Sequence, residues 1–213
     1  MEKDNILIIC RHSERIDCSN EFRNQRSKRG DPELTSNGID LSKALGQKIL
    51  SEFKPYVEQN KIKLYVSPFT RTLQTAIAMR NEMQKNLEKS TQELFIIKNL
   101  GEVNFYNFNL YPNILYYNKE NNSELYQDLI LSKMQEGKVN YEINNIENGD
   151  MRLEADERYV KVLTKLIDEL KGKESNLVII MQHGEGVAAC CRYLCEKIKE
   201  KSGNHKNKLY SDF

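Results

Sequence analysis

Arg11, His12 and Arg15 place an imidazole between two guanidinium groups, directly after the apolar run from Ile6 to Cys10. The run is short and rich in β-branched residues, which predicts a buried strand ending at one edge of a sheet. An arginine fork binds two phosphate oxygens and stays charged, and a neutral imidazole nitrogen can attack phosphorus and hold it covalently. The pattern therefore favours phosphoryl transfer, although a lone strand-end histidine beside solvated arginines is the alternative.

A second segment has a similar construction. Lys63-Leu64-Tyr65-Val66 predicts a short strand, Ser67 an N-cap and Pro68 the first position of a helix, so that Arg71 falls in the first turn. Helix N-termini present free N–H groups and the positive end of the dipole, so an arginine there strengthens a site for an anion. Taken alone, Arg71 is equally well explained as a solvated helix arginine.

A third strand end carries another histidine. The continuous apolar run Leu177–Met181 is typical of a central parallel strand, and Gln182-His183-Gly184 leads into a helical stretch. Two of the chain's 3 histidines thus stand where a strand gives way to a helix or loop. Ligands of open α/β sheets bind outside the carboxyl ends of the strands, so we expect His12, Arg71 and His183 to converge.

These segments resemble the motifs of the histidine phosphatase superfamily, in its phosphoglycerate mutase-like branch. An opening Arg-His-small-x-Arg is similar to Arg11–Arg15, and a late His-Gly is similar to His183-Gly184. The long Ser-Pro-x-x-Arg-x-x-Gln-Thr-Ala motif matches Ser67–Ala76 in full, and a Leu-Thr-x-x-Gly helix entry matches Leu34–Gly38. Members with an Arg-His-x-Glu-Arg-x-Asp opening are most similar, since Asp17 extends the match.

The resemblance implies an α/β fold, a three-layer α/β/α sandwich with a mostly parallel central sheet and a small helical cap. At 213 residues the chain fits one such domain, residues 1–213. The segment of about residues 104–150 breaks the alternation of strands and helices and is rich in Tyr, Phe and Asn, so we expect the cap there. Phe95-Ile96-Ile97 predicts a further strand.

Two helices are predicted from apolar residues at helical spacing. The first follows a Thr35 cap and the second precedes the strand at Leu177. Their core faces are expected to be Leu41, Leu45, Ile49 and Phe53 in the first helix, and Tyr159, Val162, Leu163, Leu166 and Leu170 in the second.

The resemblance also implies roles for single residues. His12 would be the catalytic nucleophile that becomes phosphohistidine. Arg11, Arg15 and Arg71 would bind the phosphate, together with His183 as a further catalytic residue, and stabilise charge in the transition state.

A general acid must protonate the leaving alcohol. The family takes it from a Leu-x-Glu-x-x-Phe region, which makes Glu102 the candidate. Glu14 and Glu185 lie nearer in sequence to the two histidines and remain substitutes, and Glu102 could also be an ordinary surface glutamate. The resemblance implies no metal and no cofactor.

The function expected is a metal-independent phosphomonoester hydrolase acting through phosphohistidine. Mutases carry basic residues after the acid, where this chain has Val103-Asn104, so hydrolysis is favoured over the alternative of a phosphoglycerate-type mutase. The family's usual glycine after the nucleophile is Ser13 here, and its usual last strand is not apparent. A catalytically idle subunit or binding module of a larger assembly is therefore a second alternative.

Composition limits the classes of partner that the chain is expected to bind. Net charge is +1, from 32 Lys and Arg against 31 Asp and Glu, which provides no global field for nucleic acid or an anionic membrane. The start of the chain lacks the pattern of a signal peptide, no apolar run has the length of a membrane span, and the 5 cysteines show no disulfide or zinc spacing. We expect a cytoplasmic protein with a small-molecule or phosphoprotein phosphoester as partner, while oligomerisation stays open.

Overall fold

Five parallel strands form one sheet in the order β1-β5-β2-β3-β4 in this computed structural model. The structure describes residues 5–18, 31–59, 61–85, 94–102, 139–142, 152–171 and 176–202. The strands are β1 (Ile6–Arg11), β2 (Ile62–Val66), β3 (Leu94–Ile97), β4 (Val139–Glu142) and β5 (Leu177–Gln182). β5 pairs with β1 on one side and β2 on the other, and all of its residues are buried. The expected parallel α/β sheet is confirmed.

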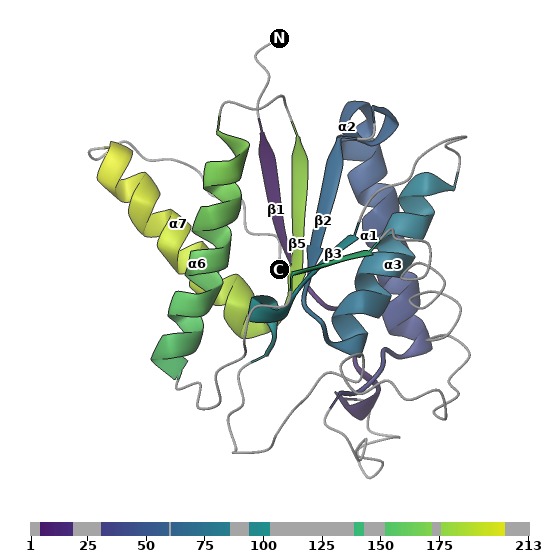
Figure 1. The fold of residues 1–213 in the computed structure, drawn as a ribbon. Helices are drawn as coiled ribbons and strands as arrows, with labels where there is room; N and C mark the ends of the chain where they lie inside the picture. Colours follow the sequence, from purple (N-terminus) through teal and green to yellow (C-terminus); the bar gives the residue numbers. More distant parts are fainter. Residues whose placement is uncertain are drawn as a thin grey trace.

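Helices cover both faces of this sheet. They are α1 (Ser36–Glu52), α2 (Lys54–Glu58), α3 (Thr70–Gln84), α6 (Arg152–Leu170) and α7 (Gly184–Ser202), with 3-10 turns η1 (Ile16–Cys18) and η2 (Lys98–Leu100). Figure 1 shows α1 and α3 on one side of β1, β5 and β2, and α6 and α7 on the other. The arrangement is the expected three-layer sandwich.

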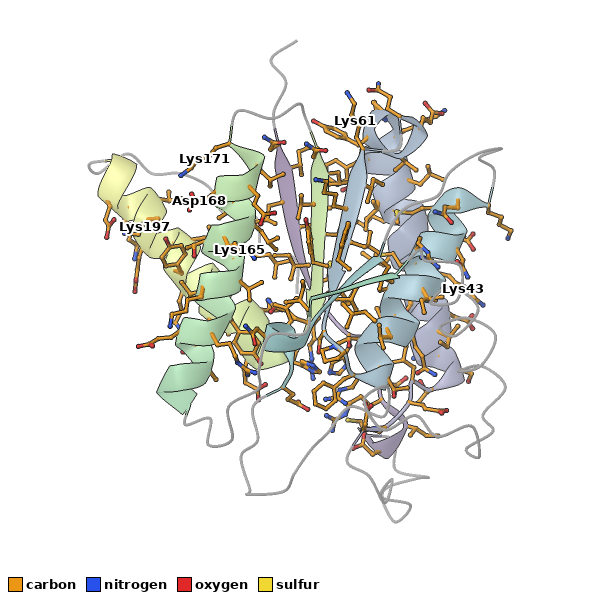
Figure 2. The ribbon with its side chains drawn as sticks, in the orientation of Figure 1. Lys43, Lys61, Lys165, Asp168, Lys171 and Lys197 are labelled. Atoms are coloured by element: carbon orange, nitrogen blue, oxygen red, sulfur yellow. The ribbon has the colours of Figure 1, made fainter. Side chains whose placement is uncertain are left out.

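Successive residues of β5 supply the two halves of the core. Ile179 packs in the cluster beneath α1 and α3 with Ile49 and Leu73. Ile180 packs on the opposite face with Tyr159 and Leu163 of α6. Lys43 and Lys197 lie outside these layers, at opposite sides of the molecule (Figure 2). The strand's continuous apolar run thus follows from burial on both faces.

The two predicted helices form, with one error in the core face of α1. Thr35 caps α1 as expected, because its Oγ1 accepts a hydrogen bond of 2.8 Å from the Gly38 N–H. Leu41, however, is 52% exposed. The buried face of α1 contains the small residues Gly38, Ser42 and Gly46 together with Ile49, which turns Leu41 toward solvent. In α6 the expected core residues Tyr159, Leu163, Leu166 and Leu170 are buried, and Val162 is partly buried.

The segment expected to form the cap contains one piece of the sheet. β4 lies within residues 104–150 and pairs in parallel with β3, from Leu94↔Val139 to Ile97↔Glu142. The remainder of that segment lies outside the described residues. Within the described part of the chain, no helix has the length and apolar character to span a bilayer. All five cysteines are described, and all are free.

Gly46 sets the distance between α1 and α3. A Cβ at this position would lie 2.4 Å from the backbone oxygen of Met79 and 3.1 Å from the Cβ of Glu82. A contact with backbone cannot be relieved by turning a side chain, so the two helices would have to separate.

We therefore expect Gly46→Ala to lower the free energy of unfolding by about 1–3 kcal/mol, the usual effect of overpacking. Helix propensity alone would predict the opposite sign, a gain of up to about 1 kcal/mol. Ala44 is exposed on the same helix, so Ala44→Gly serves as the matched control and reports propensity alone. Urea denaturation of both variants checks this, and a Gly46→Ala protein more stable than wild type would contradict it.

Candidate active site

The carboxyl ends of β1, β2 and β5 bring the two histidines together. The parallel ladder continues just past the strands, since the His12 N–H donates to Gln182 O at 3.0 Å and the Ser67 N–H donates to Met181 O at 2.9 Å. The rings of His12 and His183 consequently lie edge to face with centroids 5.5 Å apart. Both side chains are buried, with His12 6% and His183 0% exposed.

His12 is held as a neutral imidazole with one free nitrogen. Its Nδ1 lies 2.7 Å from the carbonyl oxygen of Ser13, so Nδ1 carries the hydrogen and donates it. Nε2 then keeps its lone pair. Burial, reinforced by the charges of Arg71 and Arg11, lowers the pKa of His12 to about 3, although the bond to Ser13 raises it. Near neutral pH the ring is therefore unprotonated, as a nucleophile must be.

Arg71 lies at the centre of the site with no exposed surface. Its Nη1 donates to Asp31 Oδ1 at 3.2 Å. Its Nη2 contacts the carboxylate of Glu102 and lies 3.3 Å from His183 Nδ1. Burial lowers the pKa of Arg71, while Glu102 and Asp31 raise it. The guanidinium nevertheless stays charged, since arginine does not lose its proton in proteins.

His183 is fixed by hydrogen bonds at both ring nitrogens. Arg71 can only donate, so Nδ1 of His183 accepts its bond and Nε2 carries the hydrogen. That Nε2 lies 2.8 Å from the hydroxyl of Ser67, which is also buried. The pKa of His183 is lowered well below its usual value, mainly by burial and secondly by the positive charge of Arg71. The second imidazole is therefore neutral as well.

This contact overturns the prediction that Ser67 caps the following helix. α3 begins at Thr70, and the residue in the N-cap position, Phe69, makes no side-chain cap bond. Ser67 precedes the helix by too many residues and pairs instead with the buried imidazole of His183. Arg71 still falls in the first turn, as expected.

The other two arginines differ in their surroundings. Asp17 binds Arg15 through two parallel bonds, Nε to Oδ1 at 2.9 Å and Nη2 to Oδ2 at 3.1 Å. Burial opposes the charge of Arg15, but the negative groups around it, Asp17 foremost, together raise its pKa. Its Nη1 lies 3.9 Å from Glu102 Oε1. Arg11 is exposed at the end of β1, with its guanidinium beside Gly184.

Glu102 is the anion that these groups bind in this structure. One oxygen contacts Nη2 of Arg71, and the other lies 3.9 Å from Nη1 of Arg15 and 4.0 Å from Nδ1 of His183. Its side chain is 19% exposed. The candidate acid thus occupies the point on which Arg15, Arg71 and His183 converge, where we expect a phosphoryl group.

The two substitute acids have different surroundings. Glu14 is exposed and accepts hydrogen bonds from Asn37 at 2.8 Å and Thr35 at 2.9 Å, which lower its pKa. A carboxylate held in this way at the start of α1 is a poor proton donor. Glu185 is half-buried in the first turn of α7, where burial and the nearby charge of Glu102 raise its pKa. Of the three candidate acids, Glu102 is the one that contacts Arg71, with Glu185 as its neighbour.

Two residues that sequence reasoning did not single out hold the site together. Thr75 Oγ1 accepts a bond of 3.0 Å from the Ser13 N–H and donates one of 2.7 Å to Arg71 O, which ties the segment after β1 to α3. In the sequence, Thr75 was marked only by its place in the Ser67–Ala76 motif. Asp31 accepts hydrogen bonds from Thr70 and Arg71, and its only signal was its position before a proline in a turn.

Comparison with known proteins identifies the family of the chain. The family model for the histidine phosphatase superfamily (branch 1) matches residues 7–207. No curated protein matches the chain in sequence. Among solved structures, the ecdysone phosphate phosphatase of Bombix mori in complex with tungstate has a TM-score of 0.58 at 14% identity, covering 97% of this chain and 83% of that chain.

Two other solved structures have the same fold. YhfR of Bacillus stearothermophilus has a TM-score of 0.53 at 16% identity, covering 91% of this chain and 81% of that chain. The mycobacterial glucosyl-3-phosphoglycerate phosphatase has a TM-score of 0.51 at 14% identity, covering 91% and 80%. At such identities these likenesses show the fold alone. The family match over most of the length shows more: the chain belongs to branch 1 of the histidine phosphatase superfamily.

Proposed function

We propose that the protein is a phosphomonoester hydrolase that acts through a phosphohistidine on His12, without a metal. The observation that carries this proposal is the neutral His12, whose Nδ1 is bonded to Ser13 O and whose ring centroid lies 5.5 Å from that of His183. His183 in turn converges with Arg15 and Arg71 on one anion position. The substrate class is a phosphomonoester of a small molecule or a protein. Tungstate is an oxyanion like phosphate, so the Bombix mori complex supports an oxyanion site in this fold.

In the first half-reaction the lone pair of His12 Nε2 attacks phosphorus and forms a P–N bond. The ester P–O bond breaks, and the leaving oxygen takes its electron pair together with a proton from the Glu102 carboxyl. Arg15 and Arg71 stabilise the charge on the phosphoryl oxygens, because their donors already point at that position. Glu102 is bound to Arg71 as a carboxylate in this structure, so it must leave the arginines for the phosphoryl group to reach them, and it enters the reaction in its protonated form.

In the second half-reaction a water molecule attacks the phosphohistidine. Glu102, now a carboxylate, takes a proton from that water, and the P–N bond breaks with its electron pair returning to Nε2 of His12. Inorganic phosphate leaves, and both side chains regain their starting protonation states.

The first prediction concerns the covalent intermediate. Acid-labile, base-stable phosphate should be trapped on His12 during turnover, because attack by imidazole forms a phosphoramidate. His12→Ala should reduce hydrolysis of an aryl phosphate at least about a thousandfold. Radiolabelled substrate quenched in base measures the intermediate, and protein denatured before mixing is its control. Retention of activity in His12→Ala, or isomerisation of 3-phosphoglycerate faster than phosphate release, would contradict the proposal.

The second prediction concerns the acid. Glu102→Gln should slow hydrolysis of alkyl phosphates far more than that of nitrophenyl phosphate, because nitrophenolate leaves with little protonation. kcat/KM for the two ester classes measures this difference. Glu14→Gln is the matched control, since Glu14 bonds to residues of the α1 start and should leave both rates near wild type. An equal loss for both esters in Glu102→Gln would move the acid role to Glu185.

The third prediction follows from the carboxylate that Arg15 and Arg71 now bind. Removing its charge should let inorganic phosphate bind Glu102→Gln roughly tenfold more tightly than wild type, since phosphate no longer displaces a charge-assisted contact. Calorimetric titration with inorganic phosphate measures this, again with Glu14→Gln as control. Weaker binding in Glu102→Gln would show that Glu102 assists the anion rather than competing with it.

A further inference from the structure

The N-terminus of α3 is capped by a residue from a distant segment. No side chain at the N-cap position bonds to the helix. Instead, the carboxylate of Asp31, 39 residues earlier, accepts the Thr70 N–H at 2.9 Å and 3.1 Å, and the Thr70 hydroxyl at 2.8 Å. The segment that follows Asp31 is tied to the same helix, since the Leu34 N–H donates to Gln74 Oε1 at 2.8 Å. A negative charge is favourable at this end of a helix dipole.

The same carboxylate holds one arm of Arg71. Asp31 Oδ1 accepts from Nη1 at 3.2 Å, and both side chains have no exposed surface. A buried carboxylate and a buried guanidinium each need such a partner, because an unpaired charge inside the protein is very unfavourable. Asp31 therefore links the position of the helix start to the orientation of the guanidinium.

A guanidinium is planar, so fixing Nη1 decides where its other donors point. Nε and Nη2 form the opposite edge of the group. Nη2 contacts Glu102 and His183, which places this edge at the anion position. Nε is buried and has no hydrogen-bond partner in the structure. A buried N–H donor without a hydrogen-bond acceptor is unfavourable, and an oxygen of an anion bound by Nη2 would be such an acceptor for Nε.

We propose that Asp31 is a positioning residue, which holds Arg71 by Nη1 so that Nε and Nη2 together grip the anion. The inference rests on the proposed function in taking this anion to be a phosphoryl group. It adds a specific contact, in which Nε and Nη2 donate side by side to two phosphate oxygens. It also assigns the orientation of these two donors to Asp31, a residue that touches no substrate.

The experiment separates this role from simple helix capping. Asp31→Asn removes the negative charge that faces Arg71. Oδ1 of Asp31 accepts from both the Thr70 N–H and Arg71 Nη1. The amide therefore presents either an uncharged oxygen or an N–H₂ group to both donors, and the charge-assisted anchor of the guanidinium is lost. Thr70→Val is the matched control, because it removes a hydroxyl bond to Asp31 and leaves the carboxylate on Arg71. Binding of inorganic phosphate to each folded protein is measured by calorimetry, and thermal unfolding of each is recorded.

We expect Asp31→Asn to bind phosphate roughly tenfold to a hundredfold more weakly, as for loss of a charge-assisted arginine contact, and Thr70→Val to bind within about twofold of wild type. The Nε–H signal of Arg71 in ¹⁵N NMR should shift on phosphate addition in wild type and Thr70→Val, but not in Asp31→Asn. A loss of stability alone would move neither readout.

Unchanged phosphate affinity in Asp31→Asn, or an equal loss in Thr70→Val, would overturn the positioning role and leave the phosphohistidine proposal intact. Phosphate binding with the expected variant pattern but without turnover would support the positioning role and contradict the hydrolase. Failure of wild type to bind phosphate would overturn both. Should Asp31→Asn not fold, Asp31→Ser keeps a hydroxyl for the cap and is judged by the same criteria.

Discussion

Arg71 carries a full positive charge with no contact to solvent, and a charge in that situation needs hydrogen-bond and ion-pair partners from the protein itself. Those groups come from segments far apart in the sequence: Asp31 before α1, Glu102 after η2, and His183 after β5. Each of these segments is therefore constrained by one side chain. The parallel sheet brings the strand ends to a common edge, and Arg71 fixes how the residues beyond them are arranged.

Two carboxylates near the site each bind one edge of an arginine and leave its other donors available to an anion. Asp17 takes the Nε and Nη2 edge of Arg15 and leaves Nη1 toward Glu102. Asp31 takes Nη1 of Arg71 and leaves the opposite edge. The two guanidinium groups thus present different edges to the same point, so their donors approach an anion there from two directions. The stability of each arginine in its orientation comes from acids that do not themselves face that point.

The sequence predicts the parts of the site that follow from periodicity, and misses those that depend on distant partners. His12 and His183 could be placed because strands of β-branched residues end next to them, and the parallel order then brings them together. Ser67 was misplaced because a serine before a proline is also a typical helix cap, and only the fold supplies the competing imidazole. Asp31 gave no signal beyond its position before a proline, since its partners lie 39 and 40 residues away. The prediction that Leu41 is buried was wrong for a similar reason. The buried face of α1 is the one with small residues, because only there can α3 approach closely.

The order of the strands in the sheet differs from their order along the chain, and this affects how the protein is made. β5 is the last of the described strands along the chain, yet it lies between β1 and β2 and contributes to both halves of the core. A nascent chain that has emerged only as far as β4 lacks the strand that joins β1 to the rest of the sheet. Long-range parallel pairing of this kind folds slowly and leaves apolar edges exposed meanwhile. The sheet can therefore close only after β5 has been synthesised, and until then β1 lacks its neighbour in the sheet.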